Sequence, residues 1–282
     1  MDSGFLGREE VALAKQGSLT EHGFAFRPGT NDEGIFQSVM QHDEYHLPSS
    51  FRSDDIILDV GMHIGSFCYK ALLLGSNHVY GFEAERSNYE CAVSNLKPFG
   101  NRVHLYQKAV WRSDRVGDKL FYSSSTDELN RGGGNVIWGT SGQEVPMIGL
   151  DEVLKQVTKG GKRRVRMLKI DCEGSEFPIL LTSRLLHLID EIAGEYHEYG
   201  GNFTEIPISE RAGVEGYDEF SIQELSKALQ KKGFRVTSMA HPNTNLGLFH
   251  AVNESKRLPM QEILKRQVRS TWYSISKRLK AS

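Results

Sequence analysis

The stretch that decides the fold is Ile56-Ile57-Leu58-Asp59-Val60-Gly61-Met62-His63-Ile64-Gly65, an apolar run followed by a loop with two glycines. A short apolar run that ends in such a loop is typical of a buried strand leading into a nucleotide site at the start of a helix. Dinucleotide loops carry glycine at their first position, where a pyrophosphate approaches the bare backbone. In this chain Asp59 holds that position.

Asp59 narrows the class of ligand. A carboxylate repels phosphate groups at short range, whereas a ligand with ribose hydroxyls and an ammonium group finds a partner in it. S-adenosylmethionine is such a ligand, and we expect it as the cofactor. The loop residues expected to form its site are Asp59, Gly61, His63, Ile64 and Gly65.

The composition is that of an ordinary globular enzyme. The 282 residues are 39% hydrophobic and 25% charged, with a formal net charge of -2, which argues against a disordered chain and gives no sign of a nucleic-acid partner. The apolar runs are too short to span a bilayer, and the first residues do not resemble a signal peptide. We therefore expect a cytoplasmic protein without a transmembrane segment.

Strands and helices alternate along the chain from residue 56. Apolar runs predict strands at 56–60, 78–82, 103–110, 166–170 and 191–196, with helices at 67–74, 88–96, 177–188 and 221–232 between and after them. Two final strands, 234–239 and 247–252, are joined by a turn-rich connector that predicts an antiparallel hairpin. The expected fold is α/β, with a mostly parallel seven-stranded sheet, one antiparallel strand and helices on both faces.

The chain divides into three expected parts. Residues 1–50 form an N-terminal cap or lid segment over the cofactor, 51–253 form the core, and 254–282 form a basic helical tail. A solvated helix is the favoured interpretation of the tail, ahead of a contact with a polyanion or a membrane surface. Within the core, the glycine-rich insert 123–144 is either a flap near the acceptor pocket or an exposed loop.

Two further strand ends carry candidate cofactor residues. The second strand ends at Glu83, about 20 residues beyond the glycine loop, where a carboxylate can accept both hydroxyl protons of a ribose. The third strand ends with Ala109 and Val110, a small residue followed by a backbone donor, which we expect beside the adenine ring.

Acidic residues follow the fourth and fifth strands. Asp171 stands at the tip of the fourth strand, and Glu195 and His197 lie at the end of the fifth, so the three side chains meet if the strands are neighbours. His197 or Asp171 is the expected general base. Glu173 and Glu176 are expected to orient the loop or to start the helix that follows it. Alternatively, Asp171, Glu195 and His197 hold Mg²⁺ or another divalent cation that polarises a substrate hydroxyl.

These motifs together resemble the FkbM-type methyltransferases. The matching segments are 59–65, 82–84, 150–151, 168–176 and 195–197, preceded by 27–32 and 44–45. The run Lys169-Ile170-Asp171-Cys172-Glu173-Gly174-Ser175-Glu176 is the most specific part of the match. The chain departs from the family pattern at Met62, His63 and Ala84, where alanine, asparagine and proline are usual.

The resemblance implies a class I, Rossmann-like methyltransferase that uses S-adenosylmethionine, most often on hydroxyl groups of sugars or secondary metabolites. We therefore expect a small-molecule acceptor and in-line transfer of the methyl group to oxygen. The alternatives are methylation of nitrogen on a small molecule, a nicotinamide-dependent oxidoreductase and a non-catalytic cofactor-fold binding module.

Overall fold

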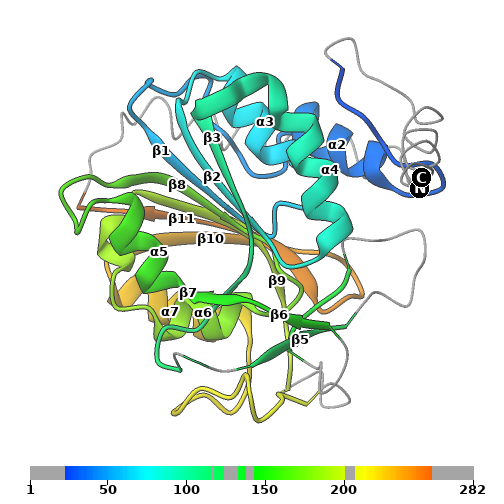
Figure 1. The fold of residues 1–282 in the computed structure, drawn as a ribbon. Coiled ribbons are helices and arrows are strands. Elements are labelled where there is room, and N and C mark those ends of the chain that lie inside the picture. Colours follow the sequence, from blue (N-terminus) through cyan, green and yellow to red (C-terminus); the bar gives the residue numbers. More distant parts are fainter. Residues whose placement is uncertain are drawn as a thin grey trace.

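A computed structural model describes residues 23–115, 117, 119–123, 133–137, 143–200 and 207–255 (Figure 1). The helices in chain order are α2 (Asp32–Met40), α3 (Ser66–Leu73), α4 (Arg86–Leu96), η1 (Lys97–Arg102), α5 (Leu150–Val157), α6 (Glu176–Thr182), η2 (Leu186–Leu188) and α7 (Ile222–Lys231). The strands are β1 (Ile56–Val60), β2 (His78–Glu83), β3 (Val103–Gln107), β4 (Ala109–Trp111), β5 (Leu120–Tyr122), β6 (Gln143–Val145), β7 (Met147–Gly149), β8 (Val165–Ile170), β9 (Glu191–His197), β10 (Phe234–Ala240) and β11 (Leu246–Asn253).

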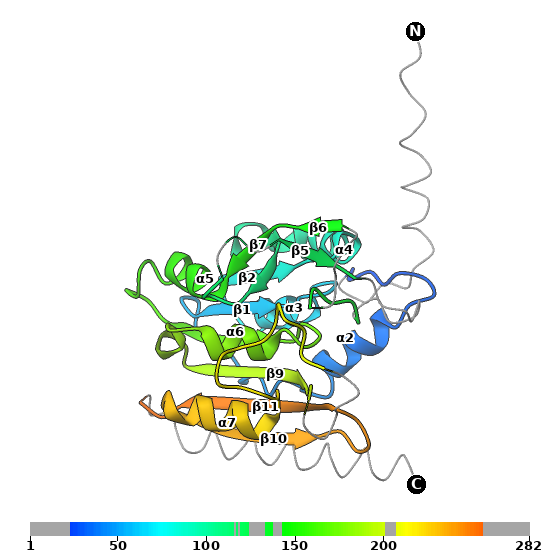
Figure 2. The same cartoon turned by 90° about the horizontal axis from the view of Figure 1, so that it is seen from below.

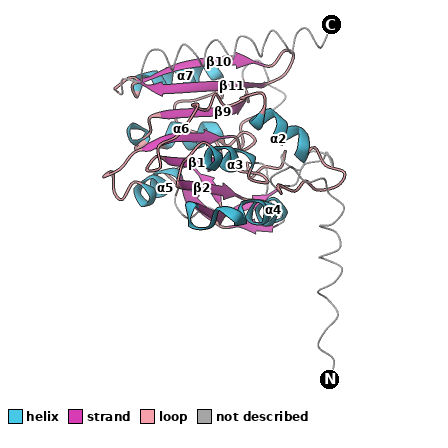
Figure 3. Cartoon of the chain, turned by 90° about the horizontal axis from the view of Figure 1, so that it is seen from above, coloured by secondary structure: helices cyan, strands magenta, loops and turns pink. Residues whose placement is uncertain are grey.

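The central sheet has seven strands in the order β10-β11-β9-β8-β1-β2-β3. Neighbouring strands are parallel from β3 to β9, and β11 runs antiparallel to both β9 and β10. Figures 2 and 3 show the succession from β2 through β1 and β9 to the pair of β11 and β10. The predicted mostly parallel sheet with one antiparallel strand is confirmed, and that strand lies second from the edge.

Strand β1 is buried on both faces of the sheet, and four of its five residues are apolar. Ile56, Leu58 and Val60 point into one hydrophobic core, and Ile57 points into a second core on the opposite face. Helices α2, α3 and α4 cover the second core, and α5, α6 and α7 cover the first (Figure 1). The predicted helices on both faces are therefore confirmed.

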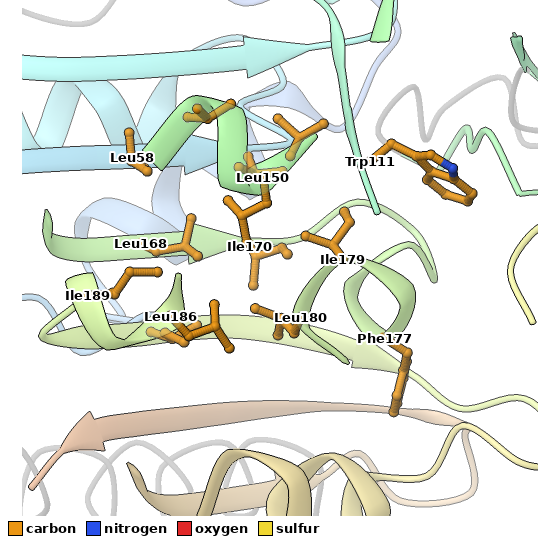
Figure 4. Packing of buried hydrophobic residues seen from close by; sticks show 14 of the residues in the cluster. Leu58, Trp111, Leu150, Leu168, Ile170, Phe177, Ile179, Leu180, Leu186 and Ile189 are labelled. Carbon is orange, nitrogen blue, oxygen red and sulfur yellow. The ribbon is translucent and has the colours of Figure 1, made fainter. Parts of the chain in front are cut away.

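The first core is formed by strand and helix side chains that meet between the layers. Leu168 and Ile170 of β8 face Leu150 of α5 and Leu180 of α6 (Figure 4). All four are fully buried. Full burial of a leucine or isoleucine side chain stabilises the fold by about 1.5–3 kcal/mol. This packing fixes the end of β8 from which the acidic loop starts.

The predicted third strand, 103–110, is wrong as a single element. The strand is interrupted at Lys108, whose N–H donates to the carbonyl of Tyr106. The N–H of Ala109 then donates to Pro146 O at 2.9 Å. Strand β3 therefore belongs to the central sheet, while β4 pairs with β7 in a separate two-stranded sheet. The predicted helix at 177–188 is also too long, because α6 ends at Thr182, whose hydroxyl bonds back to Pro178 O at 2.7 Å.

The described part of the N-terminal segment is packed into the core. Phe24, Val39, Tyr45 and Leu47 are buried in the second core together with residues of β1 and α3. Residues 1–22 and 256–282, which include the first part of the predicted cap and most of the predicted basic tail, lie outside the described residues. Within the described residues no helix combines the length and hydropathy needed to cross a bilayer.

Candidate functional site

A pocket of about 460 Å³ opens at the edge of the sheet where β1, β2, β8 and β9 end. Parallel strands bring their carboxyl ends to one edge, which is where open α/β sheets bind their ligands. Seven of the residues predicted from the sequence line this pocket: Gly61, His63, Glu83, Ala109, Val110, Asp171 and Glu195. Side chains from four separate strand ends and the loops after them are thereby brought together.

The loop after β1 turns sharply at Gly61, where only glycine fits. Its φ is +75°, and a Cβ at this position would lie 1.8 Å from the carbonyl oxygen of Asp171. The N–H groups of Gly61 and Met62 both donate to Phe82 O, at 3.0 and 3.1 Å, while Asp171 N donates to Val60 O. The loop is therefore clamped between the ends of β2 and β8.

Glu83 lies at the tip of β2, nearly buried, on the wall of the pocket. Its two carboxylate oxygens accept hydrogen bonds from His63 N at 2.8 Å and from Glu85 N at 2.9 Å. Burial raises the pKa of Glu83 to about 7. The carboxylate is thus held in one orientation by backbone donors from both flanking loops.

His63 is oriented by the N-terminal segment. Its Nε2 lies 3.0 Å from Arg27 Nη2, which can only donate, and Arg27 in turn forms an ion pair with Asp32 at 2.8 Å. Burial lowers the pKa of His63 to about 4, so the imidazole is neutral and accepts this hydrogen bond. The segment before the core therefore fixes the glycine loop from outside.

Asp59, Ile64 and Gly65, which were also predicted at the cofactor, do not line the pocket. Asp59 is fully buried, with Oδ1 3.3 Å from Lys169 Nζ and Oδ2 3.2 Å from the thiol of Cys68. Ile64 is buried in the second core, and Gly65 packs so closely on α4 that a Cβ there would lie 2.8 Å from Leu96 Cδ1. These three residues contact the protein interior and stabilise the conformation of the loop on the side away from the pocket.

Asp171 follows directly after β8 and faces the pocket. The hydroxyl of Tyr45 donates to Asp171 Oδ2 at 2.8 Å, and Lys169 Nζ lies 3.8 Å from the same oxygen. Burial, and then the charge of Asp171, raise the pKa of Tyr45 well above its usual value, so its phenol stays a donor. The carboxylate is therefore held by a group from the N-terminal segment.

Glu195 also faces the pocket, from β9. Its oxygens lie 3.9 Å from His197 Nε2 and 3.7 Å from His241 Nε2. Burial, followed by the repulsion of Asp171, raises the pKa of Glu195 to about 8. Glu195 therefore carries a proton over most of the neutral range.

His197 does not line the pocket and is nearly buried behind it. Nε2 lies 3.2 Å from Glu173 Oε2, and Nδ1 lies 3.4 Å from Glu176 Oε1. Burial alone would lower the pKa of His197, but the carboxylates of Glu176 and Glu173 outweigh it and place the pKa well above its usual value. The geometry therefore favours an imidazolium over the predicted general base.

Comparison with known families places the chain in a family. The model of the FkbM methyltransferase domain matches residues 59–236, more than half of the chain. The chain belongs to the FkbM methyltransferase family. It is thus an S-adenosylmethionine-dependent methyltransferase, as expected from the sequence, rather than a nicotinamide-dependent oxidoreductase or a non-catalytic module. A search among curated proteins gave no match.

Solved structures show distant likenesses to this FkbM-family chain. An rRNA methylase from Streptococcus thermophilus is 11% identical with a TM-score of 0.41, covering 76% of this chain and 94% of that chain. Precorrin-6y C5,15-methyltransferase from Geobacter metallireducens is 9% identical with a TM-score of 0.41, covering 84% and 93%. M. capricolum TrmK in complex with S-adenosylhomocysteine is 8% identical with a TM-score of 0.40, covering 76% and 68%. The family assignment rests on the domain model.

The predicted metal ligands of this FkbM-family enzyme do not converge as a set. Among the described residues, ligand atoms of Asp171, Glu173 and His197 lie within 4.8 Å of one another, and Glu195, the predicted third ligand, is outside this group. Both ring nitrogens of His197 also face carboxylates. The structure therefore brings Asp171, Glu173 and His197 within reach of one cation, and not the predicted set that includes Glu195.

Several residues of the FkbM-family site were not predicted from the sequence. The sequence did contain a sign that Lys169 belongs to the site, because a lysine inside an apolar strand requires buried polar partners. Glu176 begins α6 and accepts a hydrogen bond from Cys172 N at 2.7 Å, in line with the expected role, but the contacts of Glu173 and Glu176 with His197 were not predicted. Tyr122, which precedes the glycine-rich insert, also lines the pocket, as do residues 134–136 of the insert, one of whose two expected places was near the acceptor pocket. Residues 124–132 and 138–142 of that region lie outside the described part.

Proposed function

We propose that this methyltransferase transfers the methyl group of S-adenosylmethionine to a hydroxyl group on a sugar or a secondary-metabolite-like small molecule. One observation carries the proposal: Asp171 and Glu195 line the same pocket as Gly61 and Glu83. Donor and acceptor residues that share one pocket allow the methyl group and the attacking oxygen to meet at reacting distance.

The donor part of the pocket is formed by the ends of β1 and β2 and by β4. Glu83 accepts the hydroxyl protons of the ribose, because its oxygens are fixed at the wall and each retains a free lone pair. Ala109 and Val110 flank the adenine ring, and Gly61 and His63 form the turn beneath the methionine part. Asp59 acts on this site indirectly, through Lys169.

Asp171 is the proposed base. In the transfer, the acceptor oxygen attacks the methyl carbon in line with the carbon–sulfur bond, which breaks and leaves S-adenosylhomocysteine. The hydroxyl proton passes to the carboxylate of Asp171, whose orientation is set by Tyr45. Glu195, with a pKa of about 8, carries a proton near neutrality and donates a hydrogen bond to the acceptor. The ion-paired His197 holds the acidic loop in place.

Mass spectrometry with methyl-deuterated S-adenosylmethionine tests this function. The protein is incubated with a panel of sugars, phenols and amines, and labelled products are fragmented to locate the methyl group. The proposal predicts label on oxygen, with transfer slowed at least tenfold in Asp171→Asn and unchanged in the exposed control Glu90→Gln. Label found only on nitrogen would contradict the proposal and favour methylation of an amine.

A further inference from the structure

Lys169 is a buried ammonium that the proposed mechanism does not use. It lies on β8, two residues before Asp171, and only 4% of its surface is exposed. The remainder of β8 is apolar except for Arg166, so a charged side chain at this position requires compensation from its neighbours. The role of Lys169 in the site therefore depends on the groups that surround its ammonium.

Four groups surround the ammonium of Lys169, and each comes from a different part of the site. It donates a short hydrogen bond to the carbonyl of Gly61 in the donor loop. It lies 3.3 Å from Asp59 Oδ1 and 3.8 Å from Asp171 Oδ2. It also lies 5.4 Å from the centre of the Tyr45 ring, within the range of a cation–π contact. One side chain thus joins β1, the glycine loop, the acidic loop and the N-terminal segment.

Stability alone does not account for this arrangement. A buried ion pair contributes little net free energy of folding compared with apolar side chains of similar size, because desolvation offsets the attraction. What a buried, multiply bonded ammonium does supply is a fixed geometry among the groups that it bonds. Here those groups belong to the donor side and to the acceptor side of one pocket.

We infer that Lys169 is a positioning residue that fixes the Gly61 carbonyl and the Asp171 carboxylate relative to each other, so that donor binding and the acceptor-side acid are energetically coupled. The inference rests on the proposed function, in which the Gly61 loop receives the donor and Asp171 faces the acceptor. It adds a residue on the wall of the pocket that aligns the donor side with the acceptor side.

A double-mutant cycle on the binding of S-adenosylhomocysteine tests this coupling. Affinity is measured by calorimetry for the wild type, Lys169→Met, Asp171→Asn and the double variant. Lys169→Met weakens binding roughly tenfold, as expected when a hydrogen bond from a charged group is lost. Asp171→Asn changes the affinity in the wild type but not in the Lys169→Met background, so the two effects do not add. Lys169→Arg, which keeps the charge, recovers part of the affinity.

Lys232→Met is the matched control. Lys232 also donates to a backbone carbonyl, that of Ser183 at 2.7 Å, but it does not line the pocket. This variant lowers the melting temperature and leaves the affinity for S-adenosylhomocysteine unchanged. If Lys169→Met does not fold, Asp59→Asn combined with Lys169→Met removes the buried pair together and takes its place in the cycle.

The results distinguish a failure of the role of Lys169 from a failure of the proposed function. Affinity equal to the wild type in a folded Lys169→Met protein, or strictly additive effects in the cycle, would overturn the role of Lys169 and leave the proposed function intact. A wild type that does not bind S-adenosylhomocysteine would instead remove the donor site, and the proposed function with it.

Discussion

The hydroxyl of Tyr45 donates a 2.8 Å hydrogen bond to Asp171 Oδ2, across 126 positions of the sequence. Tyr45 belongs to the segment before the core, whereas Asp171 follows the central strand β8. Because Tyr45 is buried and its pKa is raised, the phenol keeps its proton and the bond fixes one face of the carboxylate. The N-terminal segment therefore contributes a side chain to the wall of the pocket.

Replacement of Tyr45 by Phe removes this bond and keeps the ring. We expect the free energy of unfolding to fall by about 1 kcal/mol, the usual net value of one hydrogen bond. Methyl transfer slows, because Asp171 loses its orientation, whereas the affinity for S-adenosylhomocysteine stays near that of the wild type. Denaturant melts, calorimetry and the labelled-methyl assay measure the three effects. Unchanged transfer would show that Tyr45 does not position the base.

We expect the replacement of Gly61 by Ala to disrupt the proposed donor site. The added methyl group would overlap the carbonyl oxygen of Asp171, and either β8 or the loop must move. Gly233→Ala is the control, since Gly233 also has a positive φ, +87°, but has nothing within 4 Å of an added Cβ. We expect a cost of about 1 kcal/mol in the control, and a larger cost with at least tenfold weaker binding of S-adenosylhomocysteine in Gly61→Ala. Equal behaviour of the two variants in thermal melts and calorimetry would contradict the close approach.

The binding of S-adenosylhomocysteine depends on pH through Glu83. Its pKa in the folded protein is about 7, above the usual 4.5, so its contribution to stability is present below about pH 4.5 and is lost as pH rises through 7. Ribose hydroxyls donate to the ionised form, and affinity therefore rises with pH up to about 7, by at most about tenfold per pH unit. Calorimetry in buffers of different ionisation enthalpy detects the released proton. The profile should be flat in Glu83→Gln, and a flat wild type would exclude Glu83 as the ribose partner.

The ion pairs of His197 stabilise the acidic loop. Replacement by Gln leaves Glu173 and Glu176 without their cation, at a cost of about 3 kcal/mol. The pKa of His197 is raised, so its contribution to stability is complete below the usual value of 6.5 and is lost only as pH rises through the raised pKa. Denaturant melts from pH 6 upward should show a difference from the wild type that shrinks at alkaline pH. A difference that grows with pH would mean that the imidazole is neutral.

The centre of the sheet could be predicted because β1, β8 and β9 are mostly apolar, are buried almost throughout and are bounded by glycine and polar turns. Strand β1 was predicted at its observed bounds, and the acids at the ends of β8 and β9 share one pocket, as predicted. The break at Lys108 was not predicted, because no glycine or proline interrupts the run from 103 to 110 and only the pairing of β4 with β7 divides it.

The roles within the site depended on contacts between distant parts of the chain. Asp59 was interpreted as a ligand of the donor, but its carboxylate forms an ion pair with Lys169, which lies 110 positions later in the chain. A sequence pattern does not reveal such long-range pairing. Likewise, His197 was expected to be a base because it stands at a strand tip. Its protonation depends on Glu173 and Glu176, whose side chains were expected to orient the loop or begin the helix.

A crystal structure with S-adenosylhomocysteine tests the central claim most directly, that donor and acceptor residues share one pocket. The account predicts the ribose hydroxyls within hydrogen-bonding distance of Glu83, the adenine beside Ala109 and Val110, and the sulfur facing the side of the pocket formed by Asp171 and Glu195. A nucleoside bound away from Glu83, or a sulfur directed away from both acids, would contradict it.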